Sequence, residues 1–297
     1  MTFTKIFCPI DFSAGSQHAA RVAIRIAKES GAELVLAHAW YIPATAYSLE
    51  APLPGDFIQG IVDDSQHRLD AAVKEAIDAG ARHTTGVLLT GLPWTQLVAQ
   101  LEKHAYDLCV IGTHGRTGLA RVLLGSVAEK VVRHAPCPVL AIRPDGEPSP
   151  FRHALVPTDF SESAAHALDL AATLVEPGGS ITLLHVIEAP VAWTGEVPLG
   201  EPPASDLLGA IDYQARRIFD NEVARFRRMS TLPITARSRV GYAGAQTLSV
   251  IDADPTIDLV VMGSHGRTGI KRVLLGSVAE KVVRHARCPV LVARKRA

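Results

Sequence analysis

Three glycines and a serine recur twice in the chain with the spacing G-x2-G-x9-G-S. The first set is Gly112, Gly115, Gly125 and Ser126, and the second is Gly263, Gly266, Gly276 and Ser277. Glycines let a backbone approach a phosphate closely and adopt positive φ. A helix that begins at such a serine offers free N–H groups and a positive dipole end to an anion. Positive charge is added within the same loops by Arg116, Arg121, Arg267 and Arg272. The pattern predicts two phosphate-binding loops.

The serine of each loop has a second interpretation. Ser126-Val-Ala-Glu129 and Ser277-Val-Ala-Glu280 read as capping boxes, S-x-x-E, in which serine and glutamate satisfy the first N–H groups of a helix. Helix initiation alone therefore explains each Gly-Ser pair. The full glycine spacing, repeated at two strand ends, favours phosphate binding for the loop as a whole.

An aspartate follows the first strand of each half, Asp11 in the run PIDFS and Asp159 in the run PTDFS. Its carboxylate is suited to contact a base or a ribose, or to support a magnesium ion. It is equally suited to a helix cap or an Asx turn, a role for which Ser13 and Ser161 compete. The sequence leaves both interpretations open.

The histidines divide into two groups. His38 and His185 lie inside the second strand of each half and are expected to be core histidines with satisfied hydrogen bonds. His114 and His265 lie within the glycine loops and are candidates for ligand contact. Their spacing does not match that of metal ligands, so we expect no metal bound by protein groups alone.

Two further sets of residues favour structural roles. Cys137 and Cys288, between a helix end and a strand, are expected to be small buried residues. An arginine cluster in the second half is expected to form a solvated helix face: Arg216, Arg217, Arg225, Arg227 and Arg228. No aromatic residues are interleaved with it, so it does not indicate nucleic-acid binding.

Strands and helices alternate along each half. In the first half we expect strands at Lys5–Ile10, Glu33–Trp40, His83–Thr90, Leu108–Gly112 and Val139–Arg143, and helices at Ala14–Ser30, Phe57–Ala79, Trp94–His104 and Ser126–His134. Short apolar strands suit a parallel sheet buried on both faces. The fold class is α/β, with two tandem doubly wound domains of the flavodoxin or Rossmann-like kind. Ligands bind such sheets at the carboxyl ends of the strands, so the Asp11 turn and the glycine loop meet if strands one and four are neighbours.

A duplication organises the whole chain. Residues 112–140 and 263–291 are identical at 25 of 29 positions, and the runs CPIDFS and LVLAHAW also have counterparts in the second half. The repeat is one domain long. We expect domains at residues 1–145 and 151–297, joined by the proline-rich linker 145–150.

Composition excludes several classes of protein. Lys and Arg together number 30, as do Asp and Glu, so no net field attracts nucleic acid or an anionic membrane. No apolar run approaches the ~18 residues of a membrane span, and no signal-peptide pattern follows Met1. The four cysteines form no CxxC pair. These features favour a cytoplasmic protein.

The chain resembles the universal stress protein family in its tandem two-domain form. Both halves match the glycine pattern of the ATP-binding branch, and the P-[IT]-D-F-S turn and the L-x-H-[AV] strand also fit. The resemblance implies a five-stranded parallel sheet in each domain and ATP, with or without Mg²⁺, as ligand. It also implies that the domains pair through their last strands, residues 139–143 and 290–294, with a homodimer and an unknown protein partner as further possibilities.

The same resemblance assigns binding residues position by position. In the first domain these are Pro9, Ile10, Asp11 and Ala39 for adenine and ribose, and Gly112, Thr113, His114, Gly115, Arg116, Gly125, Ser126 and Val127 for ribose and phosphates. In the second domain they are Pro157, Thr158, Asp159 and Val186, then Gly263, Ser264, His265, Gly266, Arg267, Gly276, Ser277 and Val278.

Three functions are compatible with these residues. The first is regulatory ATP binding in a stress response, without efficient catalysis. The second is slow ATP hydrolysis or phosphotransfer, although the chain has no Walker lysine motif and no evident base for an attacking water. The third is an interaction scaffold that binds no nucleotide. The loops after strand three differ, Thr90-Gly-Leu-Pro-Trp94 against Val240-Gly-Tyr-Ala-Gly244, so we do not expect the two pockets to be equivalent.

Overall fold

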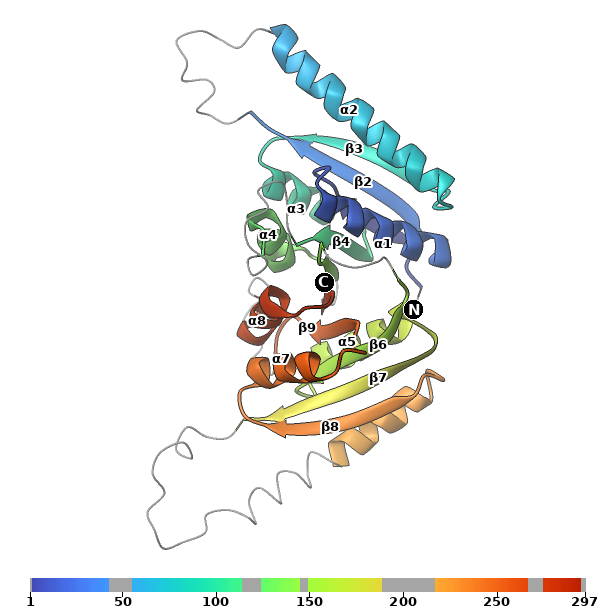
Figure 1. The fold of residues 1–297 in the computed structure, drawn as a ribbon, viewed down its shortest axis with the longest axis vertical. Coiled ribbons are helices and arrows are strands. Elements are labelled where there is room, and N and C mark those ends of the chain that lie inside the picture. Colours follow the sequence, from blue (N-terminus) through green and yellow to red (C-terminus); the bar gives the residue numbers. More distant parts are fainter. Residues whose placement is uncertain are drawn as a thin grey trace, which may run out of the picture. The chain divides into compact units, whose positions relative to one another are not determined.

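The computed structural model describes residues 2–42, 55–113, 124–144, 149–188, 217–266 and 275–294. These residues form two compact units, Thr2–Ser149 and Pro150–Arg294. Each unit is an α/β domain with its own core (Figure 1).

The first unit alternates strands and helices in the predicted order. Its strands are β1 (Lys5–Pro9), β2 (Glu33–Trp40), β3 (Thr84–Thr90), β4 (Leu108–Gly112) and β5 (Val139–Ile142). Its helices are α1 (Ala14–Ser30), α2 (Gly55–Asp78), α3 (Pro93–Lys103) and α4 (Ser126–His134). Every boundary lies within two residues of the prediction.

The second unit repeats this order. Its strands are β6 (Phe151–Thr158), β7 (Val175–Ile187), β8 (Ile234–Val240), β9 (Leu259–Gly263) and β10 (Val290–Ala293). Its helices are α5 (Glu162–Leu174), α7 (Ala243–Ala253) and α8 (Ser277–His285), with a further helical segment at residues 217–227. Strand β7 begins early because Val175 already pairs with Phe151, before a register shift between Phe151 and His153.

All strand pairs within each unit are parallel. The strand order is β3-β2-β1-β4-β5 in the first unit and β8-β7-β6-β9-β10 in the second. Strands one and four are therefore neighbours, with Phe7 opposite Cys109 and Leu155 opposite Val260. Right-handed crossovers put α1 and α2 on one face of this order and α3 and α4 on the other, because the chain reverses direction after β3.

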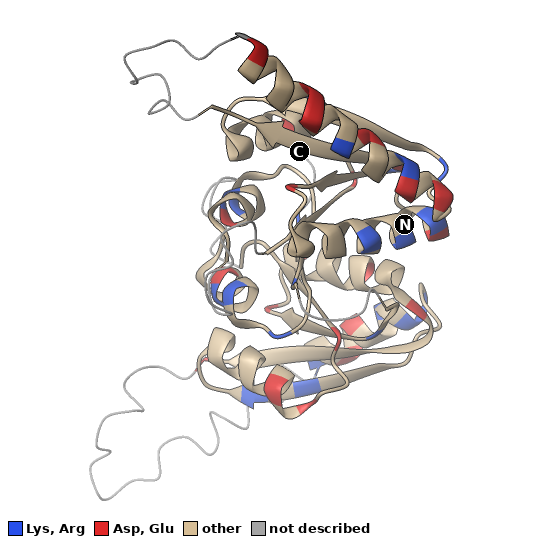
Figure 2. Cartoon of the chain, turned by 45° about the horizontal axis from the view of Figure 1, so that its top comes forward, with Lys and Arg blue, Asp and Glu red and all other residues tan. Residues whose placement is uncertain are grey.

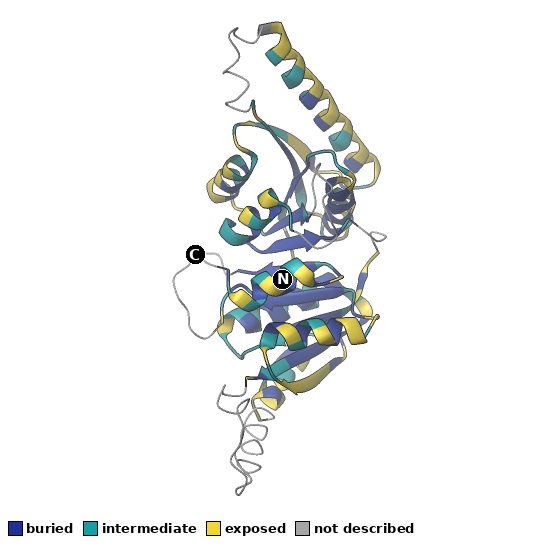
Figure 3. Cartoon of the chain, turned by 60° about the vertical axis from the view of Figure 1, so that its left-hand side comes forward, coloured by how far each residue is buried: buried dark blue, intermediate teal, exposed yellow. Residues whose placement is uncertain are grey.

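Fully buried strands form the core of each unit. Strands β1, β4 and β5 are buried along almost their whole length, as are β9 and β10 (Figure 3). Cys137 and Cys288 are buried too, as expected. Burial on both faces explains why these strands are continuous apolar runs in the sequence.

Charges of both signs are distributed together over the helices (Figure 2). On α2, for example, Arg68 lies 3.9 Å from Asp64 and Lys74 lies 2.5 Å from Asp78. No helix in the described ranges is long and apolar enough to cross a membrane.

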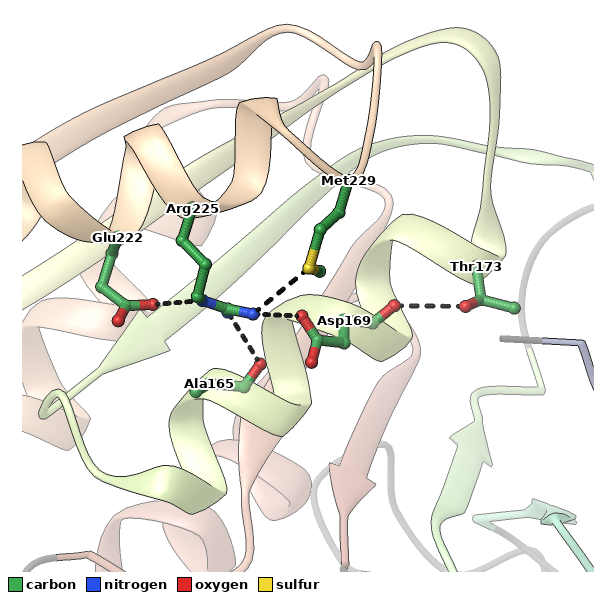
Figure 4. Close-up of polar contacts among 6 residues, drawn as sticks. All are labelled: Ala165, Asp169, Thr173, Glu222, Arg225 and Met229. Carbon is green, nitrogen blue, oxygen red and sulfur yellow. Dashed lines mark hydrogen bonds and ion pairs between the residues drawn. The ribbon is translucent and has the colours of Figure 1, made fainter.

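The expectation of a solvated arginine face is wrong for Arg225. Its guanidinium donates to Asp169 on α5 at 2.9 Å and to the carbonyl of Ala165 at 3.4 Å, and it also contacts Glu222 (Figure 4). The side chains of Arg225 and Asp169 are only 28% and 24% exposed. Arg225 therefore fixes the helical segment 217–227 to α5, whereas Arg217, Arg227 and Arg228 are exposed. Arg216 lies outside the described residues.

Candidate functional site

A cavity of about 830 Å³ opens at the carboxyl ends of the strands of the first unit. All nine predicted site residues that the structure describes in this unit line it: Pro9, Ile10, Asp11, Ala39, Gly112, Thr113, Gly125, Ser126 and Val127. The cavity size suits a small-molecule ligand. His114, Gly115, Arg116 and Arg121 lie outside the described residues.

The second unit has an equivalent cavity of about 640 Å³. Its lining includes every predicted site residue described there: Pro157, Thr158, Asp159, Val186, Gly263, Ser264, His265, Gly266, Gly276, Ser277 and Val278. Arg267 and Arg272 lie outside the described residues. The duplication in sequence is thus matched by a duplicated cavity.

The aspartate of each turn has a structural role. One oxygen of Asp11 accepts hydrogen bonds from the backbone N–H of Ser13 at 3.0 Å and from the Ser13 hydroxyl at 2.5 Å. Ser13 is the N-cap of α1 and accepts from the N–H of Ser16 at 3.2 Å. Asp159 and Ser161 repeat the two backbone bonds: the Ser161 N–H donates to Asp159 at 3.0 Å, and the Ala164 N–H donates to the Ser161 cap at 3.3 Å. The aspartate therefore forms the Asx turn, the serine is the cap, and both carboxylates still line their cavities.

The residue after each aspartate is held in a left-handed conformation. Phe12 and Phe160 both have φ of 63°, which is uncommon for a bulky side chain and needs support from its surroundings. The ring of Phe12 lies 4.5 Å from that of His38, and the ring of Phe160 lies 4.5 Å from that of His185. Each histidine in turn bonds the turn backbone through Nδ1, at 2.8 Å from the carbonyl of Ile10 or Thr158. The predicted hydrogen bonds are confirmed, and the histidines support the turn. The predicted burial holds for His38 but not for His185, which is half-buried, and both histidines line their cavities.

The capping-box interpretation of the Gly-Ser pairs is wrong. The N-cap of α4 is Gly125 and that of α8 is Gly276, and glycine has no side chain that could cap a helix. Ser126 and Ser277 are the first helical residues, one position too late for an N-cap. Glu129 and Glu280 instead face Arg133 at 3.4 Å and Arg284 at 3.2 Å.

This shift leaves the start of each helix open to a ligand. The first helical bonds run from Glu129 N–H to Gly125 and from Glu280 N–H to Gly276, both at 2.9 Å. Helix geometry leaves the N–H groups of the three residues before each glutamate without a helical partner. Those residues line the cavities: Ser126, Val127 and Ala128 in the first, and Ser277, Val278 and Ala279 in the second. Such a helix end favours an anion.

Among the described loop glycines, Gly112, Gly263 and Gly266 act through close approach and not through positive φ. None of the described loop glycines is among the positive-φ residues of the chain. A Cβ on Gly112 would lie 2.8 Å from the carbonyl oxygen of Gly15, and one on Gly263 would lie 2.6 Å from the Ser163 hydroxyl. One on Gly266 would lie 3.0 Å from an Asp159 carboxylate oxygen. Glycine therefore brings the loop against the aspartate turn and the first helix.

Sequence reasoning missed the wall that α2 adds to the first cavity. This wall comprises Asp56, Phe57, Gly60, Ile61, Asp64, Ser65 and Arg68. Residues 60, 61, 64, 65 and 68 follow the three-to-four spacing of one helix face, which was visible in the sequence. That spacing does not say what the face contacts, because only the tertiary fold brings α2 to the carboxyl end of β2.

Comparison with known proteins identifies relatives over the whole chain. The model of the universal stress protein family matches residues 2–143 and again residues 150–294. Universal stress protein Rv2623 of Mycobacterium tuberculosis is 31% identical over 300 residues, covering 98% of this chain and 96% of that protein. Universal stress protein MJ0531 of Methanocaldococcus jannaschii is 39% identical over 145 residues, which cover 48% of this chain and 82% of that protein.

A solved structure has the same fold over the full length. The crystal structure of a universal stress protein from Archaeoglobus fulgidus superposes with a TM-score of 0.68 and 20% sequence identity. The superposition covers 98% of each chain. The fold of both domains is therefore also found in a known structure.

Proposed function

The chain belongs to the universal stress protein family, and from this premise we propose that each of its two domains binds one ATP as a regulatory ligand in a stress response. Binding would change the shape or the partners of the protein, without efficient catalysis. The ligand, its regulatory use and its stoichiometry are the substance of the proposal.

One feature carries the proposal. In each unit, a helix begins with N–H groups that have no partner within the helix, in the same cavity as a carboxylate-bearing turn, and both features lie at the ends of adjacent parallel strands. The helix end suits the phosphates. The apolar and backbone groups of strands one and two suit a base and ribose.

The roles of individual residues follow the family pattern. In the first domain Pro9, Ile10, Asp11 and Ala39 would contact adenine and ribose, while Gly125, Ser126 and Val127 would hold phosphates. Thr158, Asp159, Val186, Gly276 and Ser277 would do the same in the second.

The proposal includes Mg²⁺ as an ion bound with the phosphates. Mg²⁺ in nucleotide sites takes one or two carboxylates, phosphate oxygens and waters. The Asp11 carboxylate and the Ser126 hydroxyl line one cavity and are oxygen ligands of this kind. Within the described residues no group of three His, Cys, Asp or Glu side chains could hold a metal. The ion would therefore arrive with the nucleotide.

Nucleotide stoichiometry tests the proposal directly. The purified chain is denatured, and the supernatant is assayed for adenine nucleotide; calorimetry of the nucleotide-free protein gives the number of sites. We expect two ATP per chain. Absence of both co-purified nucleotide and measurable ATP affinity would leave the scaffold function as the better explanation.

Single-site variants assign the two sites. Gly125→Val and Gly276→Val each place a branched side chain where the loop meets the helix, so each is expected to remove one bound ATP. Retention of two ATP by either variant contradicts the site assignment. Release of ADP over many turnovers by the wild type, lost in the double variant, would instead favour a hydrolase.

We also propose a cytoplasmic location and a role for self-association or a protein partner. Four buried cysteines, none of them in a disulfide, suit a reducing compartment: Cys8, Cys109, Cys137 and Cys288. Sizing of the chain with and without ATP tests whether nucleotide changes its association.

A further inference from the structure

Three side chains from three elements are stacked at the aspartate turn of the first unit. The Phe12 ring lies 4.5 Å from the His38 ring of β2, and the Arg68 guanidinium of α2 lies 4.2 Å from the centre of the Phe12 ring. The cation–π contact and the fixed turn restrict the orientation of Arg68. Arg68 is thus a long charged side chain held in place beside the predicted nucleotide cavity.

The position of Arg68 points to a role at the base end of the cavity. Arg68 lines the cavity together with Asp64 and Ser65. The phosphate end lies at α4, which follows β4, whereas α2 contacts β2 and β3 on the other side of β1. A nucleotide with its phosphates at Ser126 therefore extends its base toward α2.

The ion pair between Arg68 and Asp64 is expected to add little to the stability of the domain. The atoms are 3.9 Å apart, and the side chains are 43% and 70% exposed. Exposed ion pairs of this kind contribute little. A guanidinium supplies only donors and a carboxylate only acceptors, so together they complement a base edge that places an acceptor beside a donor. Adenine has such an edge, with a ring nitrogen beside its amino group.

Among the described residues of the second unit, no such arrangement is repeated. Leu34 pairs with Thr84 and Ile181 pairs with Ile234, which aligns β3 with β8 at an offset of 150 residues. The same offset puts Ile218 at the position of Arg68, and Phe160 is contacted by the Phe219 ring at 5.2 Å. The helical segment 217–227 is fixed by Arg225 and Asp169 instead (Figure 4).

We infer that Arg68 is a ligand-contacting residue of the first site alone, and that with Asp64 it reads the acceptor–donor edge of an adenine base. This inference rests on the proposed function. The first site would then select its base through Arg68 and Asp64, whereas the second site has Ile218 at the position of Arg68.

The experiment uses the full chain with the second site removed by Gly276→Val. Calorimetry measures ATP and inosine triphosphate, in which an oxo group replaces the amino group. We expect the parent to prefer ATP by about tenfold, the effect of one hydrogen bond to a charged group. Arg68→Leu is expected to lose about tenfold in ATP affinity, because the donor to the ring nitrogen is lost. Asp64→Leu is expected to lose most of the ATP preference, because the acceptor for the amino group is lost.

Two further variants separate recognition from packing. Arg68→Lys keeps the charge over Phe12 but not the planar set of donors, so we expect an unchanged melting temperature with a reduced ATP affinity. Arg21→Leu removes an exposed arginine that lines the adjoining groove between α1 and α2 but not the nucleotide cavity, and both affinities should be unchanged.

The outcomes are distinguishable. A parent that binds neither nucleotide overturns the proposed function. A parent that binds ATP while Arg68→Leu keeps both its affinity and its preference overturns only the role of Arg68. Equal ATP preference at the second site, measured in the Gly125→Val chain, also overturns it.

Discussion

The backbone N–H of Gly125 donates a hydrogen bond to the carbonyl oxygen of Thr113 at 2.7 Å. Gly276 and Ser264 repeat this bond at 2.9 Å in the second unit. The bond joins the two ends of the glycine loop, so the end of strand four and the start of the next helix are fixed relative to each other. Ser126 and Ser277 then begin helices whose first N–H groups face the cavities.

This geometry predicts that Ser126→Asp abolishes nucleotide binding in the first domain without harming the fold. A carboxylate in the first turn interacts favourably with the helix dipole, by about 0.3 to 1 kcal/mol. The same charge repels a phosphate. Calorimetry should show one ATP per chain in place of two, with an unchanged or slightly raised melting temperature. Ser277→Asp is the matched variant, and two ATP in either would contradict phosphate binding at the helix start.

Asp11→Asn separates the two roles of the aspartate. The Asn side-chain oxygen can still accept from the Ser13 N–H, so the Asx turn and the stability of the domain should persist. Loss of the charge should weaken binding of Mg²⁺–ATP by about tenfold or more, since a hydrogen bond or ion contact to a charged group is lost. Binding is measured in the Gly276→Val chain at fixed Mg²⁺. Unchanged affinity would reduce Asp11 to a turn residue.

Arg225→Met should destabilise the second domain. The substitution leaves Asp169 half-buried without its guanidinium, and we expect a loss of about 1 to 2 kcal/mol in the free energy of unfolding. Urea denaturation measures this loss, and a double-mutant cycle with Asp169→Ala isolates the pairwise part. Arg227→Met, at an exposed position of the same helical segment, is the control and should change stability little.

Because the Cys8 thiol is buried, we expect the first domain to lose stability at high pH. Burial raises the pKa of its thiol to about 12, whereas an unfolded cysteine titrates near 8.5. The native state thus retains the proton that the unfolded state loses. Its stabilising effect is complete below about pH 8.5 and is lost progressively as the pH rises from about 9 toward 12.

The pH effect is checked by denaturation across that range. Cys8→Ala should have a flatter stability profile above pH 9 than the wild type. The native Cys8 thiol should also resist alkylation at pH 8.5 and react once the protein is unfolded. Rapid labelling of native Cys8 would show that the strand opens readily.

The sequence by itself determined the order of the elements and the place of the cavities. Apolar runs such as Leu108–Gly112 indicate buried parallel strands, because both faces of such a strand are shielded from water. Parallel topology then places the Asp11 turn and the Gly125 helix start at one edge, and the pairing of β1 with β4 in the structure brings them together. The second half repeats this arrangement, with Asp159 and Gly276 lining its cavity.

Tertiary structure decided what local patterns left open. The S-x-x-E run predicted that Ser126 caps the helix. In the structure the Gly125 N–H bonds to the Thr113 carbonyl, and the helix already begins at Ser126, so Gly125 is the N-cap. The sequence predicted a solvated Arg225, whereas in the structure it bonds to Asp169, which is 56 positions away. No pattern in the sequence marked Arg68 as a site residue, and only the packing of α2 places it over Phe12. In each case the partner is distant in sequence, so no local pattern encodes the contact and only the packing of helices on the sheet creates it.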